Sequence, residues 1–176
     1  MIGINKGEVK LVAHSTDWST IFNEEKKLLH SLIGEHIQDI QHIGSTAING
    51  IAAKPLIDIV VGVQTMADVE QFDTEKLKAI GYYHLHRVKL DKKEVFAKFS
   101  NLETLTKTHI LHIVEYQDEW WNQHIFFRDF LNRHPEVAKE YETLKKTLAF
   151  KYPNNERAYT DEKKAFVDDV LNNMEK

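Results

Sequence analysis

Residues 42–63 read HIGSTAINGIAAKPLIDIVVGV, and this stretch decides the fold. It predicts a strand, a tight turn at Gly44 and then a second strand. The second strand is apolar almost throughout, as expected of a central strand covered on both faces. Asp58 is the exception inside it. A carboxylate in apolar surroundings is costly unless it is paired, protonated or bound to a metal ion, so Asp58 needs a reason.

The turn before this strand offers such a reason. Gly44 lets the backbone approach a phosphate closely, and the hydroxyl of Ser45 with neighbouring N–H groups can hold phosphate oxygens. Asp58, at the far end of the same unit, can hold the magnesium ion that accompanies a nucleotide. A Gly-Ser pair alone is usually just a turn. Its combination with Asp58 is what predicts a phosphate-binding site.

The connection between the two strands adds two candidates. Residues 46–53 are expected to form a short helical turn, and Thr46 at its start is a ligand-binding candidate with Gly44 and Ser45. Lys54 precedes Pro55, which favours an extended conformation. Lys54 could reach a phosphate as a point charge, or it could equally be a solvated lysine at the entrance of the strand.

The same stretch resembles the signature of the GrpB family, whose predicted fold is nucleotidyltransferase-like. Five later segments resemble the same family: THILHI at 108–113, FRDFL at 127–131, HPE at 134–136, YETLK at 141–145 and YTDEK at 159–163. The resemblance covers nearly the whole chain, in order. It implies an α+β fold, with a mixed β-sheet, helices packed on it and a C-terminal helical segment.

The composition is typical of one globular domain spanning residues 1–176. Hydrophobic residues make up 42% of the chain and charged residues 28%, and the net charge of −4 argues against a general nucleic-acid binder. Cysteine is absent, which excludes disulfides and thiolate metal sites. No segment approaches the ~20 apolar residues that span a bilayer, and the N-terminus lacks a signal-peptide core. We therefore expect a cytoplasmic protein without a membrane partner.

Hydrophobic periodicity predicts the other elements. Strands are expected at 9–13, 37–43, 82–88, 94–100 and 105–116. Helices are expected at 17–33, 66–80, 119–131, 135–150 and 157–174. The sheet core then covers about 9–116, and the C-terminal helices cover about 119–175.

Two residues outside this stretch are candidates for the neighbourhood of Asp58. Side chains alternate along the 105–116 strand, so His109 and His112 point to opposite faces and cannot form a joint zinc site. His112 lies on an otherwise apolar face and is assigned as the partner of Asp58, although a buried core histidine explains it as well. Glu25 lies on the apolar stripe of the first helix, either as a boundary glutamate or as a carboxylate that faces the site.

The C-terminal helices contribute three further candidates. Arg128 lies beside an aromatic packed face, where it could clamp a phosphate or pair with an acidic side chain. Tyr159 and Lys163 are four residues apart, so they share one helical face. In the family that this chain resembles, such a pair lies in a matching segment, which implies that both residues face the ligand.

Nucleotidyl transfer is the reaction that the resemblance implies. Enzymes of this fold hold two metal ions with three carboxylates, two of which come from an Asp-x-Asp or Asp-x-Glu pair on one strand. Here Val60 occupies the second position, and the third falls in the histidine-bearing 109–115 region. Either the site uses an altered set, with Asp58, His112 and Glu25 holding magnesium, manganese, zinc or nickel, or it binds its ligand without turnover.

Two main functions follow. As a transferase with an unknown acceptor, the protein would use Asp58, Lys54 and Arg128 in catalysis. Its ligand-binding residues would be Gly44, Ser45, Thr46, Tyr159 and Lys163. As a binding or helper module, it would hold a nucleotide or another phosphate-bearing small molecule. Family members resemble a segment fused to dephospho-CoA kinase in some bacteria, which implies a role near coenzyme A synthesis. A small metalloenzyme using Asp58 and histidines is a third reading.

Overall fold

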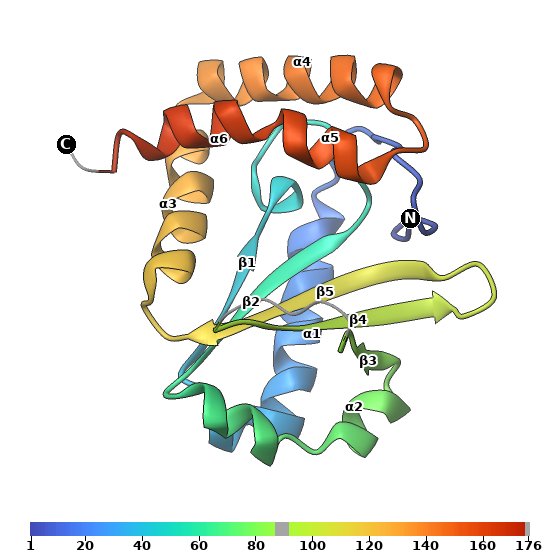
Figure 1. The fold of residues 1–176 in the computed structure, drawn as a ribbon, viewed down its shortest axis with the longest axis vertical. Coiled ribbons are helices and arrows are strands. Elements are labelled where there is room, and N and C mark those ends of the chain that lie inside the picture. Colours follow the sequence, from blue (N-terminus) through green and yellow to red (C-terminus); the bar gives the residue numbers. More distant parts are fainter. Residues whose placement is uncertain (87–91, 175–176) are drawn as a thin grey trace.

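The computed structural model describes residues 1–86 and 92–174. Its centre is a five-stranded sheet in the order β1-β2-β5-β4-β3 (Figure 1). The strands are β1 (Asp39–Ile43), β2 (Ile57–Val63), β3 (Tyr82–His84), β4 (Glu94–Asn101) and β5 (Thr106–Glu115). β2 and β5 run parallel, and the other three neighbouring pairs are antiparallel. The sheet is therefore mixed, as predicted.

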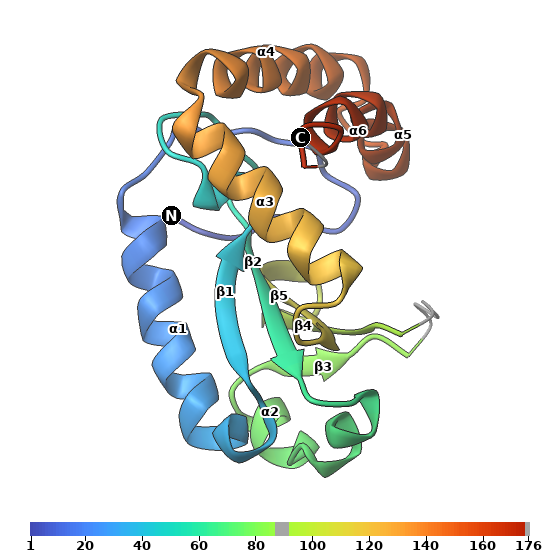
Figure 2. The same ribbon diagram turned by 90° about the vertical axis from the view of Figure 1, so that its left-hand side faces the viewer.

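Helices cover both faces of this sheet and one of its ends (Figures 1 and 2). They are α1 (Asp17–Ile33), α2 (Thr74–Ala79), α3 (Glu119–Arg133), α4 (Pro135–Lys151), α5 (Glu156–Glu162) and α6 (Lys164–Leu171). α1 packs on one face and α3 on the other, while α4, α5 and α6 lie over the end where β1 stops and β2 starts (Figure 2). This arrangement confirms the α+β class. Among the described residues, no helix has both the length and the apolar character to cross a membrane.

Side chains alternate between the two faces of the sheet along β2, which explains why Asp58 points away from the core cluster beneath α1. Ile57, Ile59 and Val61 belong to the core cluster beneath α1, whereas Val60 packs with Trp121 of α3. Asp58 shares the α3 face with Val60, because side chains two apart in a strand point the same way. Asp58 lies near the first residue of β2, so it emerges at the end of the sheet that α4–α6 cover.

Several predicted elements have different limits in the structure. Residues 9–13 do not form a strand and make only an isolated bridge, Val12 to Ala53. The expected 66–80 helix is divided into a 3-10 helix, Met66–Gln71, and α2, because Asp73 caps a new helix by accepting from the Lys76 amide. The 46–53 turn is helical only over Ser45–Ala47, and the 157–174 helix is divided at Lys163. The predicted 82–88 strand ends at His84, and residues 87 and 88 lie outside the described chain.

The segment between the Gly44 turn and β2 is held by side chains from the C-terminal helices. Asn132 of α3 donates to the Ala47 carbonyl oxygen and accepts from the Asn49 amide, at 3.0 and 2.9 Å. On α4, Glu142 accepts from the Ala52 amide at 2.7 Å, and Lys145 donates to the Ala52 carbonyl oxygen. These bonds replace the strand partner that residues 47–52 lack, and they fix the turn relative to α4.

The Glu142 contact gives a stability prediction. Bonds from Lys139 and from the Ala52 amide hold the pKa of the Glu142 carboxyl at about 2, below its ordinary 4.5. A depressed carboxyl pKa stabilises the folded state above pH 4.5, and this stabilisation is lost as the pH falls towards 2. We expect Glu142→Ala to lower the free energy of unfolding at pH 7 by about 1–3 kcal/mol, because it leaves a buried amide unsatisfied.

Glu140 provides the matched control, since it is an exposed glutamate on the same helix. Glu140→Ala should change stability by no more than about 0.5 kcal/mol. Urea unfolding between pH 7 and pH 3 measures both variants. A Glu142→Ala cost that stays constant over this range would show that the carboxylate charge contributes nothing to the contact.

Candidate active site

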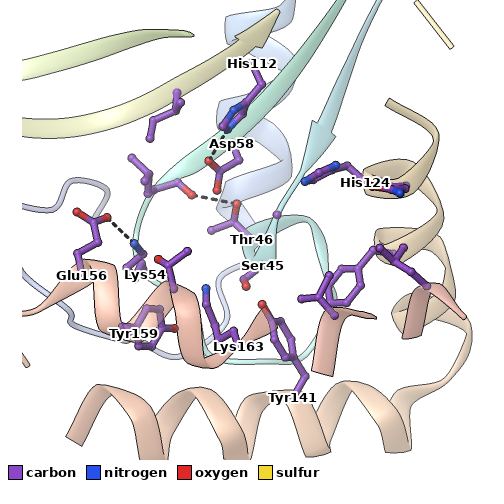
Figure 3. Close-up of a pocket in the computed structure, with 18 residues that line it drawn as sticks. Ser45, Thr46, Lys54, Asp58, His112, His124, Tyr141, Glu156, Tyr159 and Lys163 are labelled. Atoms are coloured by element: carbon purple, nitrogen blue, oxygen red, sulfur yellow. Dashed lines mark hydrogen bonds and ion pairs between the residues drawn. The ribbon is translucent and has the colours of Figure 1, made fainter. Parts of the chain in front are cut away.

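A cavity of about 360 Å³ lies where the Gly44 turn, the start of β2 and helices α3 to α6 meet (Figure 3). We call it the central cavity. It is lined by these residues of the predicted site: Gly44, Ser45, Thr46, Lys54, Asp58, His112, Tyr159 and Lys163. These residues come from the strands and from the C-terminal helices. The fold therefore brings together side chains that are more than a hundred positions apart in the sequence.

Gly44 and Asp58 are in direct contact. Gly44 has a φ of 72°, and a Cβ atom placed there would lie 2.6 Å from Oδ2 of Asp58. Only glycine combines this left-handed backbone with so close an approach. The turn therefore presents Ser45 to the same cavity as the carboxylate, and the hydroxyl of Ser45 points into it (Figure 3).

Thr46 is the least available of the predicted ligand-binding residues. Its hydroxyl donates to the Leu56 carbonyl oxygen at 3.2 Å and lies 2.9 Å from Nε2 of His42. Thr46 is only 4% exposed. Its hydroxyl therefore closes the turn against Leu56, the residue that precedes β2.

Asp58 and His112 form a hydrogen-bonded pair on the α3 face of the sheet. Oδ1 of Asp58 lies 3.3 Å from Nε2 of His112. Burial raises the pKa of the Asp58 carboxyl, but the bond from His112 and the nearby Lys54 and Lys163 outweigh it, so the pKa is below the ordinary value. Burial lowers the pKa of His112 more than Asp58 raises it. The pair is therefore an ionised carboxylate that accepts a hydrogen bond from a neutral imidazole.

Two lysines face the carboxylate from the opposite side of the cavity. Lys54 and Lys163 lie 5.6 and 4.4 Å from the centre of the same Tyr159 ring. Lys54 also donates to Oε1 of Glu156 at 2.8 Å, whereas Lys163 has no ion pair within residues 1–86 and 92–174. Burial, followed by the charge of Lys54, lowers the pKa of Lys163 to about 8.

Aromatic side chains complete the wall, and sequence reasoning did not single them out. Phe127 and His124 come from α3, and Tyr141 comes from α4 with its hydroxyl directed towards Ser45 (Figure 3). Burial raises the pKa of Tyr141 to about 12, so this hydroxyl stays protonated at neutral pH. Tyr141 does lie in a segment quoted for the family resemblance. The sequence around Glu156 does not mark it as a site residue, because its partner Lys54 is distant in sequence and becomes its neighbour only in the fold.

Two predicted site residues lie elsewhere, which corrects those assignments. Glu25 binds Lys98 with both carboxylate oxygens at 2.9 Å and lies 3.9 Å from His109, on the α1 face of the sheet. Its helix stripe faces the sheet as expected, but from the side opposite to Asp58. Arg128 donates to Asp129, Gln41 and the His42 carbonyl oxygen, at 2.7 to 3.0 Å. It fastens α3 to β1 and does not line the cavity.

A two-metal site does not fit these residues. Val60, at the position of the second carboxylate, is fully buried against α3, and Glu25 is on the other face. No cluster of three or more His, Asp or Glu side chains suited to a metal ion occurs in the described parts of the chain. Within the described residues, β2 therefore offers one carboxylate to this cavity, that of Asp58, and it is hydrogen-bonded to His112.

The fold is shared with a class of proteins that is broader than a single family. A crystal structure of the Cid1 poly(U) polymerase with MgGTP bound matches this chain with a TM-score of 0.52 and 14% identity. The match covers 78% of this chain and 44% of the Cid1 chain. At that identity the likeness shows the fold alone, and that fold is nucleotidyltransferase-like.

The chain belongs to the GrpB family, because the model of the GrpB protein matches residues 8–173. It is 64% identical to the glutamate-rich protein GrpB of Alkalihalophilus pseudofirmus over 99% of this chain and 100% of that one. The crystal structure of the conserved protein GrpB from Enterococcus faecalis matches with a TM-score of 0.83 and 28% identity. That match covers 93% of this chain and 96% of the other.

Proposed function

We propose that this protein binds a nucleotide in the central cavity and holds its phosphates with Lys163, Lys54 and the Gly44–Ser45 turn. The observation that carries the proposal is Lys163, which enters the cavity without an ion-pair partner in the described residues and has a pKa lowered to about 8 by burial. A partly buried ammonium is costly unless an anion compensates it. A phosphate in the cavity would provide that anion and would raise the pKa of Lys163 again.

Asp58 sets a condition on this ligand. An ionised carboxylate beside the Gly44 turn repels phosphate unless a cation or a hydrogen-bond donor lies between them. A single divalent ion, magnesium or manganese, would fit here with an oxygen of Asp58 and phosphate oxygens as donors. Zinc or nickel would need an imidazole lone pair, which Nε2 of His112 does not offer while it donates to Asp58.

Nucleotidyl transfer is the second candidate, and the ionised Asp58 of the cavity favours it. With Val60 in place of a second carboxylate, the residues do not provide the two-metal clamp that stabilises both the attacking and the leaving oxygen. We therefore place ligand binding first. A helper role near coenzyme A synthesis remains compatible with binding, because dephospho-CoA carries an adenine nucleotide.

Thermal unfolding with a panel of ligands tests the proposal. The panel contains ATP, GTP, CTP, UTP and dephospho-CoA, each with and without magnesium or manganese. A bound ligand raises the midpoint in proportion to the logarithm of its concentration. Pyrophosphate release from the same triphosphates, in the presence of cell extract, reports turnover, and release that disappears in Asp58→Ala would support transfer. A midpoint unchanged by every ligand at millimolar concentration would refute the proposal.

Substitution of Lys163 gives the most specific test of the proposed phosphate contact. We expect Lys163→Ala to weaken nucleotide binding by about 10- to 100-fold, as expected for the loss of a charged hydrogen bond. The neighbouring Lys164→Ala is the control, because Lys164 is 74% exposed and pairs with Asp168. Calorimetric titration of both variants with the best ligand of the panel measures the difference. Equal affinity of the two variants would show that the phosphates bind elsewhere.

A further inference from the structure

His124 lines the central cavity from α3, and its ring is fixed in orientation. Nδ1 lies 2.7 Å from the carbonyl oxygen of Trp120, one turn earlier in the same helix. The ring stacks on the indole of Trp120, with centroids 3.5 Å apart and planes 17° apart. Trp120 in turn contacts the ring of His112 and lies 4.2 Å from the ammonium of Lys93. These contacts hold the imidazole in one position.

The position of the single proton on His124 follows from this geometry. A carbonyl oxygen can only accept, so Nδ1 carries the proton and donates it to Trp120. Burial lowers the pKa of His124 to about 4, so the ring is neutral at physiological pH. Nε2 therefore bears a lone pair, and it is the only polar atom of the ring that remains available to a ligand.

The second histidine of the cavity has the opposite tautomer. Nε2 of His112 lies against the Asp58 carboxylate, which can only accept, so His112 carries its proton on Nε2. His112 is thus committed to Asp58, whereas Nε2 of His124 has no hydrogen-bond partner within the described chain. A polar atom in a partly closed cavity normally has a partner, either protein, water or ligand.

Ionised phosphate oxygens cannot provide that partner, because they only accept hydrogen bonds. A ribose hydroxyl or the N–H of a base can provide it. The cavity wall near α3 and α6 is also apolar, with Phe127, Val167 and Leu171 among its lining residues. At about 360 Å³ the cavity is larger than a phosphate group alone requires. These features suit the nucleoside part of a ligand.

We infer that His124 accepts a hydrogen bond from a hydroxyl or N–H group of the nucleoside, while the lysines hold the phosphates. This assignment depends on the proposed nucleotide binding. It makes His124 a specificity-determining residue, because a ligand that has phosphates but no donor at this position cannot satisfy Nε2. The inference therefore deepens the proposed nucleotide binding, because it assigns the α3 side of the cavity to the nucleoside and the lysine side to the phosphates.

Two probes separate the two ends of the cavity: a nucleoside triphosphate and inorganic tripolyphosphate, both titrated calorimetrically with magnesium at constant pH. His124→Phe keeps a ring that can stack on Trp120 but removes both nitrogen atoms. We expect it to weaken binding of the nucleoside triphosphate by up to about tenfold and to leave tripolyphosphate binding unchanged. His124→Gln places an amide oxygen near the position of Nε2, and we expect it to restore part of the lost affinity.

The controls distinguish failure of this inference from failure of the proposed function. If His124→Phe binds every nucleoside triphosphate as tightly as the wild type, or loses tripolyphosphate to the same degree, His124 does not contact the nucleoside. If the wild type binds neither probe, the proposed function fails and this inference fails with it. Thermal midpoints of the two variants verify that both are folded, and His124→Gln keeps the test decisive should His124→Phe unfold.

Discussion

Gly44→Ala is expected to lower the free energy of unfolding by about 2–6 kcal/mol and to abolish nucleotide binding. The first part of the cost is backbone strain, since φ is 72° and ψ is −174° at Gly44, a conformation that essentially only glycine adopts, and an L-residue there loses about 1–3 kcal/mol. The second part is the clash of the new Cβ atom with Oδ2 of Asp58 at 2.6 Å, comparable to an overpacked core at about 1–3 kcal/mol. To relieve the clash, either the turn or Asp58 must move.

Gly50→Ala separates these two contributions. Gly50 has a φ of 73°, almost the same as Gly44, but a Cβ atom there would meet nothing within 4 Å. The control should therefore show the cost of a positive φ without the clash, and it should retain nucleotide binding. Urea unfolding gives the two stabilities, and titration with the nucleotide gives the affinities. Equal costs for the two alanine variants would mean that the contact between Gly44 and Asp58 imposes no constraint.

The surroundings of Asp58 also show how much of the site the sequence could predict. An acidic residue inside an apolar strand singles out Asp58 as a candidate, because burying a carboxylate is expensive enough to require compensation. The alternation of β5 then placed His112, and not His109, on the face of Asp58, and the structure confirms this placement. Both inferences used the two-residue period of a strand, which is fixed by backbone geometry.

The spacing of residues along the predicted helices was less informative than the spacing along the strands. It placed Glu25 on the apolar stripe of the first helix, but a helix stripe does not reveal which face of the sheet the helix covers. Glu25 therefore pairs with Lys98 on the α1 side of the sheet, opposite to Asp58 and His112. Arg128 was ambiguous for the same reason, since its partners Gln41 and His42 belong to β1. His124 and Glu156 depend on contacts between segments that only the tertiary fold brings together.

The buried ammonium of Lys145 leads to the second large effect. Lys145 is 1% exposed, donates to the Ala52 carbonyl oxygen and lies 4.9 Å from the centre of the Tyr141 ring. Burial, reinforced by the charge of Lys163, lowers its pKa from 10.5 to about 7. Between these two values the unfolded chain binds more protons than the folded one, so this residue makes the protein more stable as the pH rises.

Lys145→Met keeps most of the side-chain volume and removes the titrating group. We expect the stability of the wild type, relative to Lys145→Met, to rise by on the order of 4 kcal/mol between pH 7 and pH 10, because the folded and unfolded chains differ by up to one bound proton over these three pH units. Lys93, whose pKa is lowered to about 8, titrates in both proteins and cancels in the difference. The part of the effect that comes from the charge of Lys163 fades above pH 8, because the pKa of Lys163 is also lowered to about 8. Urea unfolding of both proteins at several pH values measures this difference in stability.

Lys146→Met is the matched control, because Lys146 is the next residue of α4 and is 59% exposed. It should follow the wild type at every pH. A neutral Lys145 amine still donates to Ala52, so the segment before β2 should keep its position at high pH, and nucleotide binding should not require the Lys145 charge. A difference between wild type and Lys145→Met that does not vary with pH would show instead that the ammonium stays charged, stabilised by Ala52 and the Tyr141 ring.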